Sequence, residues 1–404
     1  MKRRLLDIIR CPIDGSELDL AVFKSRTEKL DPGRCALVLG ESADKSTTER
    51  LYGEEVLEGV LVSKKDGHLY PIIDGVPRLI ADAASVYSDF FARHSAAAST
   101  GQNASRLSDE RSPESFGRQW SNYQFEDRTW FKDLKLRERE FLYSMALTEE
   151  ALPGRVLLDA GCGHGALTAA ITGAYAVETV GLDFTDAVGR AQASREKFAG
   201  GYAPFVHYVQ GDLLQPPLAP AVFDFVHSSG VIHHTPDPRR AFRSLFDATR
   251  PDGRVYVQVY RKREAWVGIP NILIRSVTTR IPTRLLWALC VCGVPVHTAL
   301  VHVVAALRGE RPMLAKCTRR ERALSLFDNY SPRYQFRYRP EEIRRFFTDM
   351  GIEEVHDTTL ANEARHMVAF VGVKTATRTV ELEPKPVKAD AAEAEVAAGA
   401  PAVA

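Results

Sequence analysis

Acidic and glycine residues cluster in residues 156–165, which read Val-Leu-Leu-Asp-Ala-Gly-Cys-Gly-His-Gly. An apolar strand that ends in Asp159 and breaks into alternating glycines is typical of a loop that holds a nucleotide. Glycine lets the backbone turn tightly and come close to a ligand. Residues 166–171 continue with spacing that suits a helix. The run therefore predicts a strand-to-helix crossover with a cofactor site at its turn.

A second acidic residue lies at the spacing expected for ribose recognition. Residues 177–182 predict a second strand that ends at Asp183, 183 − 159 = 24 residues after Asp159. A carboxylate in this place can accept hydrogen bonds from ribose hydroxyls. Gly161, Gly163 and Ala166 also satisfy the relaxed dinucleotide fingerprint. On these residues alone, an NAD oxidoreductase stays open.

The chain after this loop continues to alternate strands and helices. Residues 205–210 predict a third strand that runs into Gly211, Asp212 and Leu213, and residues 223–227 predict a fourth. Asp237 can cap a helix whose first turn begins with Pro238, and residues 254–260 alternate as a fifth strand does. This order of elements predicts an α/β fold with a mostly parallel sheet.

These motifs, in this order, resemble the class I S-adenosylmethionine-dependent methyltransferases. The resemblance covers roughly residues 113–260 and 328–373. It implies a Rossmann-like, doubly wound, mostly parallel seven-stranded sheet and methyl transfer from S-adenosyl-L-methionine by direct displacement. A neutral adenine and a ribose diol need buried acceptors, whereas phosphates would reward cationic groups near the loop. The loop itself carries no lysine or arginine.

The resemblance also implies which residues bind the cofactor. These are Asp159, Gly161 and Gly163 for the methionine part, Asp183 for the ribose, Phe184 against the adenine ring, Asp212 and Leu213 at the adenine edge, and Ser229 after the fourth strand. Residues 116–120, with Gln119 and Trp120, resemble an aromatic leader that folds over the cofactor. A helix packed on the sheet is the alternative for this leader.

Two histidines follow the fourth strand and are the candidate catalytic residues. His233 or His234 could take a proton from a phenol, a hydroxyl or an acidic carbon of the acceptor. We expect one of the two to be structural. Asp328 and Tyr330 are weaker candidates.

Residues 1–80 carry a second resemblance, through Cys11-Pro12-Ile13-Asp14-Gly15 and the stretch 70–77. They are similar to the small zinc-ribbon proteins that activate methyltransferases. Of the ligand positions in that family only Cys11 keeps a cysteine, and Asp14, Ser63 and Asp66 stand at the others. One thiolate, two carboxylates and a hydroxyl together make a weak set of zinc ligands. His68 lies nearby in the sequence, but a lone histidine is more often a surface or packing residue than a ligand. We expect a degenerate ribbon without a metal.

The remaining segments complete the domain plan. We expect a linker over 81–112, a methyltransferase domain over 113–373 with a helical insertion at about 261–334, and a disordered tail over 374–404. The insertion should form a lid and set acceptor specificity, because insertions on the ligand side of an open sheet commonly shape binding sites.

Residues 285–307 contain no Asp, Glu, Lys or Arg. Their length would suffice for a membrane span. Gly293 and Pro295 interrupt the stretch, so we favour two apolar helices that form a lid or tunnel. A buried helical hairpin is open as well. Arginines at both ends would also suit peripheral contact with an anionic membrane surface.

Composition limits the setting and the partners. The net charge of +1 over 404 residues argues against nucleic acid as a partner, and six scattered cysteines favour a reducing cytoplasm. We expect a cytoplasmic methyltransferase with a small, apolar or lipid-like acceptor, methylated on oxygen or carbon; its oligomeric state is open. The alternatives are a non-catalytic or partner-regulated protein of this fold, and an enzyme acting on RNA or protein.

Overall fold

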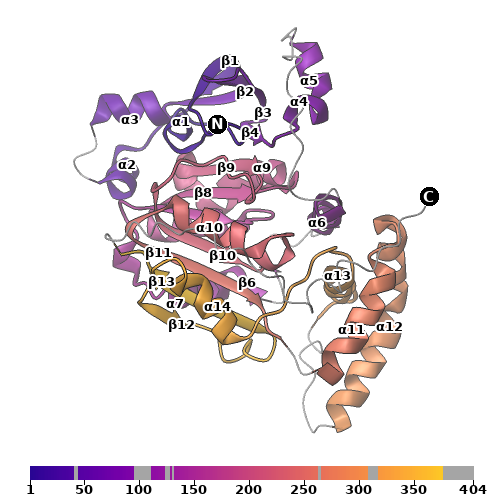
Figure 1. The fold of residues 1–404 in the computed structure, drawn as a ribbon. Coiled ribbons are helices and arrows are strands. Elements are labelled where there is room, and N and C mark those ends of the chain that lie inside the picture. The colour runs from indigo at the N-terminus through magenta and orange to yellow at the C-terminus, as the bar shows by residue number, and fades with distance from the viewer. Residues whose placement is uncertain are drawn as a thin grey trace.

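A computed structural model describes residues 1–40, 44–94, 111–122, 128–129, 132–262, 265–307 and 317–375. Its core is an eleven-stranded sheet in the order β1-β2-β3-β4-β9-β8-β7-β10-β11-β13-β12. The seven strands from β9 to β12 form the sheet expected for the methyltransferase domain, and β1 to β4 extend it at one edge (Figure 1).

Seven strands make up the larger domain. They are β7 (Val156–Ala160), β8 (Glu178–Asp183), β9 (Val206–Gly211), β10 (Phe223–Ser229), β11 (Thr249–Tyr260), β12 (Val355–Asp357) and β13 (Met367–Val373). The pairs from β9 through β11 are parallel, whereas β13 pairs antiparallel with both β11 and β12. The predicted mostly parallel, doubly wound sheet is confirmed.

Helices cover both faces of this sheet. On one face lie α7 (Leu134–Ser144), α8 (Ala166–Tyr175) and α9 (Ala187–Ala199); on the other lie α10 (Pro238–Ala248) and α14 (Pro340–Thr348). Strand alternation explains the two layers, because Leu157 packs toward α7 and α8 while its neighbour Leu158 packs toward α10 and α14. A strand buried on both faces reads as a continuous apolar run, as β7 does.

The N-terminal domain is a small antiparallel sheet with short helices. It contains α1 (Leu5–Ile8), β1 (Leu18–Thr27), α2 (Pro32–Leu39), α3 (Lys45–Tyr52), β2 (Glu54–Ser63), β3 (Leu69–Ile73) and β4 (Val76–Leu79). β4 pairs parallel with β9, with Arg78 opposite Gln210 and Leu79 opposite Gly211. The two domains therefore share one sheet and one core, since Leu5 and Ile8 belong to the same hydrophobic core as residues of α10.

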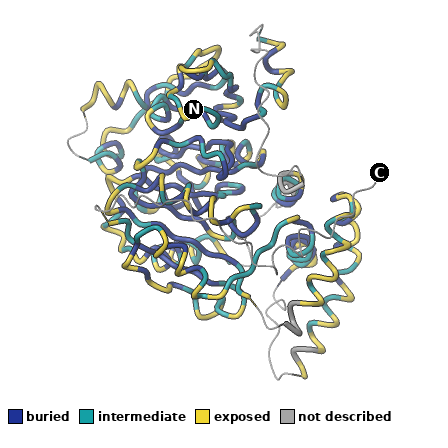
Figure 2. The backbone as a smooth tube through the Cα atoms, in the orientation of Figure 1, coloured by how far each residue is buried: buried dark blue, intermediate teal, exposed yellow. Residues whose placement is uncertain are grey.

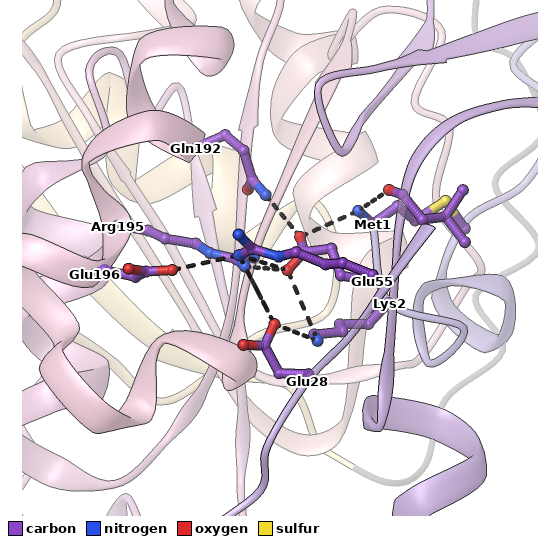
Figure 3. A network of polar contacts seen from close by, with 9 residues as sticks. Met1, Lys2, Glu28, Glu55, Gln192, Arg195 and Glu196 are labelled. Carbon is purple, nitrogen blue, oxygen red and sulfur yellow. Dashed lines mark hydrogen bonds and ion pairs between the residues drawn. The ribbon is translucent and has the colours of Figure 1, made fainter. Parts of the chain in front are cut away.

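Buried charges reinforce this junction. Glu55 of β2 is fully buried and pairs with Arg195 of α9, with Lys2 at 3.7 Å and with the Met1 amine at 3.3 Å. Gln192 of α9 donates to the same carboxylate at 2.8 Å (Figure 3). Because each buried charge has opposite partners, the cost of desolvating them is offset by attraction across the junction.

The segment expected to be a linker contains two helices, α4 (Ala83–Val86) and α5 (Ser88–Arg93). Phe90 and Phe91 of α5 are buried with Val60 of β2. The apolar residues over 81–94 do not repeat with a helical period for long enough to predict these two helices from the sequence. Residues 95–110 of the expected linker and 376–404 of the expected tail lie outside the described residues.

The insertion comprises α11 (Ala265–Thr278), α12 (Thr283–Leu307) and α13 (Arg319–Tyr330). The expectation of two helices within 285–307 is wrong, because α12 runs unbroken through Gly293 and Pro295. Proline in a helix costs about 3 kcal/mol. Packing of Leu286, Cys290 and Val294 in the interior offsets that cost.

Three further segments complete the described chain. α6 (Arg111–Asn122) precedes the short strands β5 (Arg128–Thr129) and β6 (Lys132–Asp133), which pair antiparallel. Three-residue and six-residue 3₁₀ turns lie at Glu149–Ala151, Gly200–Phe205 and Ile232–His234. Of these segments, α6 and the turn at Ile232–His234 contribute directly to the candidate site.

Candidate active site

The glycine loop after β7 has the backbone that its sequence predicts. Gly161, Gly163 and Gly165 have φ values of +85°, +56° and +72°, where a side chain is strained. A Cβ at Gly161 would lie 2.1 Å from Val231, and one at Gly163 would lie 2.6 Å from the Trp120 ring. The loop needs glycine both for its turns and for the close approach of neighbouring side chains.

Asp159 ends its strand as a buried structural acceptor. Thr168 donates to its carboxylate at 2.6 Å, and the Nδ1 atom of His227 lies 3.1 Å away. Burial disfavours its charge, but hydrogen bonds from His227 and Thr168 outweigh this and lower the pKa of Asp159. The carboxylate thereby ties the start of α8 to β10 beneath the glycine loop.

Asp183 joins the ends of two neighbouring strands. Its carboxylate accepts from the Gly163 amide at 2.9 Å and from the amide and hydroxyl of Thr185 at 2.9 and 2.7 Å. Burial raises the pKa of Asp183 despite these donors. A carboxylate offers about four acceptor positions, and three are used here, so about one remains on Oδ2 for a hydroxyl donor.

Asp212 and Leu213 follow β9 at the same edge of the sheet, and both are buried. Asp212 Oδ1 accepts from the Leu214 amide at 2.8 Å. Asp212 Oδ2 is buried and has no hydrogen-bond partner among the described residues. Because an unpaired buried acceptor costs about 1–3 kcal/mol, this atom points to a donor supplied by a ligand.

Phe184 and Ser229 flank this edge. Phe184 is half-buried, and its carbonyl accepts from Gln210 Nε2 at 3.1 Å. Ser229 is exposed and donates to Gln258 at 2.7 Å. The exposed Ser229 therefore lies at the open rim of the strand ends, while Phe184 is fixed through its backbone.

The leader helix α6 reaches this edge, as expected for Gln119 and Trp120. The Trp120 ring lies over Gly163 and 5.2 Å from the His164 ring, between centroids. Gln119 is fully buried, and neither its amide oxygen nor its amide nitrogen has a hydrogen-bond partner by geometry within the described chain. The helix thus supplies an aromatic cover and an unsatisfied amide to the same region.

A buried aromatic and polar cluster lies beside the candidate cofactor residues. The His233 ring packs 4.1 Å from the His234 ring and 4.3 Å from the Tyr260 ring, between centroids. Tyr260 donates to Asp328 at 2.8 Å, and the Gln119 amide acts to lower the pKa of Asp328. We refer to Gln119, His233, His234, Tyr260 and Asp328 as the acceptor cluster.

The two histidines of the acceptor cluster differ in their bonding. His234 Nδ1 lies 2.9 Å from the Tyr334 carbonyl and must donate to it. Neither ring nitrogen of His233 has a partner in the described part of the chain. Burial, then the neighbouring His234 and Arg337, lower the pKa of His233 well below 6.5, and burial lowers that of His234 to about 3. Both rings are therefore neutral near pH 7.

Burial disfavours the charged forms of the two remaining titratable members of the cluster. Burial raises the pKa of Asp328, although the hydrogen bond from Tyr260 and the nearby Gln119 amide oppose the shift. Burial and the nearby Asp328 raise the pKa of Tyr260 well above 10. The sequence did not predict Tyr260 as a site residue, because it is one of the regularly alternating residues of the fifth strand. Tyr330, the other weak candidate, is half-buried at the end of α13.

In the N-terminal domain, residues at the zinc-ligand positions of the ribbon family form hydrogen bonds within the protein. Cys11 Sγ lies 3.1 Å from the Tyr70 hydroxyl, and burial raises the pKa of the Cys11 thiol. Asp14 accepts from Ser63 at 2.5 Å and from the Ser16 amide at 2.8 Å. A neutral thiol does not suit zinc.

Asp14, Asp66 and His68 have potential ligand atoms within 4.8 Å of one another. The structure therefore brings His68 together with two carboxylates, whereas the sequence analysis treated it as a lone histidine. Exposed acidic residues often gather without a metal, and here no thiolate joins them. The absence of zinc stays a prediction.

The strand order and the site define a protein of the class I methyltransferase fold. Residues 158–257 match the family model described as a methyltransferase domain, and residues 2–75 match the model described as a Trm112p-like protein. The chain thus contains a methyltransferase domain and, at its N-terminal side, a Trm112p-like domain.

Curated relatives match over a limited part. The O-methyltransferase cnsE of Penicillium expansum is 30% identical over 107 residues, which are 26% of this chain and 37% of that protein. Phosphoethanolamine N-methyltransferase 2 of Caenorhabditis elegans is 28% identical over 113 residues, which are 27% of this chain and 25% of that protein. The matches span well under half of either relative.

Solved structures with similar folds include two of note. A putative S-adenosyl-L-methionine-dependent methyltransferase of Methanococcus maripaludis has a TM-score of 0.39 and 14% identity, covering 69% of this chain and all of that one. A complex of the Haloferax volcanii Trm112 methyltransferase activator with a putative methyltransferase has a TM-score of 0.36 and 15% identity, covering 64% and 97%.

Proposed function

We propose that this protein transfers a methyl group from S-adenosyl-L-methionine to a small, apolar or lipid-like acceptor, on oxygen or carbon. The observation that carries the proposal is the buried, unpaired Oδ2 atom of Asp212 at the carboxyl end of β9. Ligands of open α/β sheets bind at this edge of the strands. An adenine amino group is a donor that would satisfy such an atom.

The other proposed cofactor residues support the same ligand. Asp183 is a buried carboxylate with remaining acceptor capacity, Phe184 offers an aromatic face, and the glycine loop leaves room for close backbone approach. Ser229 lies at the rim, Gln119 and Trp120 come from the cover helix, and Asp159 holds the loop from beneath. When bound, the cofactor would supply an electrophilic methyl group.

The acceptor cluster supports a hydroxyl or acidic carbon as the attacking group. His233 is neutral and has no partner among the described residues, so it can accept a hydrogen bond or a proton from an acceptor. His234 is held by Tyr334 through Nδ1 and would orient its neighbour. We therefore assign the proton-accepting role to His233 and a positioning role to His234.

Burial of this cluster contributes to catalysis in a second way. Displacement at a methyl group needs alignment of the two reactants and removal of water more than it needs covalent chemistry. Gln119, His233 and Asp328 are all at least nine-tenths buried. A water-poor site of this kind favours an apolar acceptor that presents a single polar group.

The proposed setting follows from the same features. With a net charge of +1, the chain offers no general attraction for nucleic acid, and we propose a cytoplasmic enzyme with a small-molecule acceptor. The Trm112p-like domain leaves a partner-regulated protein as a second candidate, because the small zinc-ribbon proteins that this domain resembles activate methyltransferases. A non-catalytic cofactor-binding role is the corresponding alternative.

Radiolabelled transfer tests the proposal. The protein is incubated with methyl-labelled S-adenosyl-L-methionine and, in parallel, with long-chain alcohols, substituted phenols, β-diketones, total RNA and total protein. We expect label in an organic extract, and we expect the Asp212→Asn variant to lose it. Label only in RNA or protein would refute the small-acceptor proposal, and cofactor binding with no transfer to any acceptor would favour the non-catalytic alternative.

A further inference from the structure

The insertion presents an apolar surface that the described residues leave uncovered. α11 and α12 lie at the edge of the molecule, and much of each helix is exposed (Figures 1 and 2). Leu273 and Val277 of α11 are 64% and 61% exposed. Val296, Leu300 and Leu307 of α12 are 59–83% exposed. We call these five residues, with Leu289, the outer face.

The exposed residues of α12 share one side of the helix. Leu289, Val296, Leu300 and Leu307 are separated by 7, 4 and 7 residues, which brings each back to nearly the same direction at about 3.6 residues per turn. Leu286, Cys290 and Val294 lie on a different side of the helix and are buried. α12 therefore has a buried inner side and an exposed apolar outer side.

The charges around this face have one sign. Residues 265–307 contain three arginines and no aspartate or glutamate. Arg275 is used within the protein, where it donates to the carbonyls of Asn329 and Pro332, each at 2.6 Å. Arg280 and Arg284 are exposed at the turn between the two helices. An apolar face with cations at its end is complementary to an anionic lipid surface.

The inner side of α12 argues against a membrane span. A stretch from Thr283 to Val303 is long and apolar enough to cross a bilayer. However, Arg322 of α13 donates to Thr298 of α12 at 2.9 Å, inside the stretch and five residues before its end. A span would bring Arg322 and its neighbours Arg319 and Arg320 to hydrocarbon depth, which costs several kcal/mol. Lying in the interface avoids this cost.

We propose that the outer face of α11 and α12 docks this protein on an anionic lipid membrane, with the helices lying in the interface and α13 facing the protein. Asp328 of α13 belongs to the acceptor cluster, so the docked helices are joined to that cluster through one packed helix. Access of lipid-borne acceptors through this face rests on the proposed function. The docking itself does not.

Vesicle flotation tests the docking. The full-length protein is mixed with phosphatidylcholine vesicles or with vesicles in which phosphatidylglycerol replaces part of the phosphatidylcholine. We expect flotation with the anionic vesicles and at least tenfold weaker binding for the variant Leu273→Glu/Val296→Glu/Leu300→Glu. The matched control Val22→Glu/Leu37→Glu/Val86→Glu changes exposed apolar residues of the N-terminal region and should bind like the wild type.

A second variant tests the docking even if the triple-glutamate variant fails to fold. Arg280→Glu/Arg284→Glu leaves the apolar face intact and should reduce binding to anionic vesicles by tenfold or more, because each basic residue near an anionic surface strengthens attraction to it. Cofactor binding is measured on every sample. Loss of flotation with retained cofactor binding assigns the defect to docking, whereas absence of cofactor binding in the wild type refutes only the proposed function.

Two results would overturn the docking. The first is wild-type protein that does not float with anionic vesicles, or that floats equally well when the outer face carries three glutamates. The second is a dimer in analytical ultracentrifugation that the outer-face variant dissociates, without any vesicle binding. That result would assign the face to a second copy of the chain.

Discussion

Arg78 of the N-terminal domain donates to Asp186 at 3.1 Å, across the shared edge of the two domains. Its guanidinium also lies 3.4 Å from the Gln210 amide oxygen, and Gln210 in turn donates to the Phe184 carbonyl. Phe184 and Asp186 belong to the loop that starts at Asp183. A residue of the N-terminal domain thus holds the loop on which we place ribose and adenine recognition.

Removal of this side chain should weaken the cofactor site. The Arg78→Ala variant loses both donors and leaves the Gln210 oxygen with fewer partners, so we expect the affinity for S-adenosyl-L-methionine to fall about tenfold, or about 1.4 kcal/mol. Calorimetric titration measures this. The control is Arg239→Ala, which removes an exposed Arg–Asp pair at 2.9 Å on α10. Equal affinity in both variants would show that the N-terminal domain does not support the loop.

The contact between Gly163 and Trp120 predicts a double-mutant cycle. The Gly163→Ala substitution puts a Cβ 2.6 Å from the Trp120 ring and also strains the backbone at φ +56°. We expect it to destabilise the protein, and we expect the Trp120→Ala background to relieve the steric part, leaving about 1–2 kcal/mol of backbone strain. Denaturant unfolding of the four proteins gives the coupling energy. Purely additive effects would mean that the ring does not lie on the loop.

The buried histidines predict an unusual response to pH. The folded pKa of His233 is lowered well below 6.5 and that of His234 to about 3, so both stay neutral while an unfolded histidine gains its proton near pH 6.5. Stability is therefore present above the unfolded pKa and falls as the pH drops below it, by up to about 1.4 kcal/mol per pH unit for each histidine.

NMR of ring-labelled protein tests this directly. The signals of His233 and His234, assigned with the His233→Gln and His234→Gln variants, should not titrate between pH 7.5 and about 5.5, since that range lies around the ordinary histidine value. A titration step near pH 6.5 for either ring would place it in water, and the acceptor cluster would then lack its dry interior.

The buried Glu55 predicts strong destabilisation when its charge is removed. Burial opposes its ionisation, but the Met1 amine, Arg195 and Lys2 lower the pKa of Glu55 far below 4.5. The Glu55→Gln variant leaves Lys2 and Arg195 with fewer partners, and loss of one member of a buried pair costs about 3–5 kcal/mol. Thermal unfolding at pH 7 measures the loss, with Glu17→Gln at an exposed pair as the control.

The same carboxylate sets a pH dependence. Because its folded pKa lies below its unfolded value, the stabilisation is complete above about pH 4.5 and is lost as the pH falls toward the folded pKa. The difference in stability between the wild type and Glu55→Gln should therefore shrink on acidification. A difference that grows at low pH would contradict an ionised Glu55 in the folded protein.

Much of the fold follows from local patterns. Continuous apolar runs such as Val156–Ala160 and the glycine turn after Asp159 mark strands and crossovers with little ambiguity, and the order of the parallel strands follows from their connections. The sequence did not predict that β4 pairs with β9. Only two residues of each strand are paired, which is too few to produce a recognisable sequence pattern. Nor did the sequence predict that α12 runs through Pro295, because its packing on α13 outweighs a local penalty.

The candidate site was only partly predictable for a similar reason. Asp183 and Asp212 follow strands that end at the same edge, so their proximity follows from the topology. Tyr260 and Asp328 are 68 residues apart, and their hydrogen bond depends on how the insertion folds back. The hydrogen bonds of Asp159 to Thr168 and His227 also needed the structure, since local sequence does not show which side chains surround this carboxylate.

The most direct test of the central claim is calorimetric titration of the wild type and of Asp212→Asn with S-adenosyl-L-methionine and, separately, with NAD. The substitution preserves the Oδ1 acceptor for Leu214 and replaces the unpaired Oδ2 with a donor. We predict binding of S-adenosyl-L-methionine by the wild type, at least tenfold weaker in the variant, and no response to NAD. Binding of NAD without S-adenosyl-L-methionine, or equal affinity in both proteins, would contradict the account.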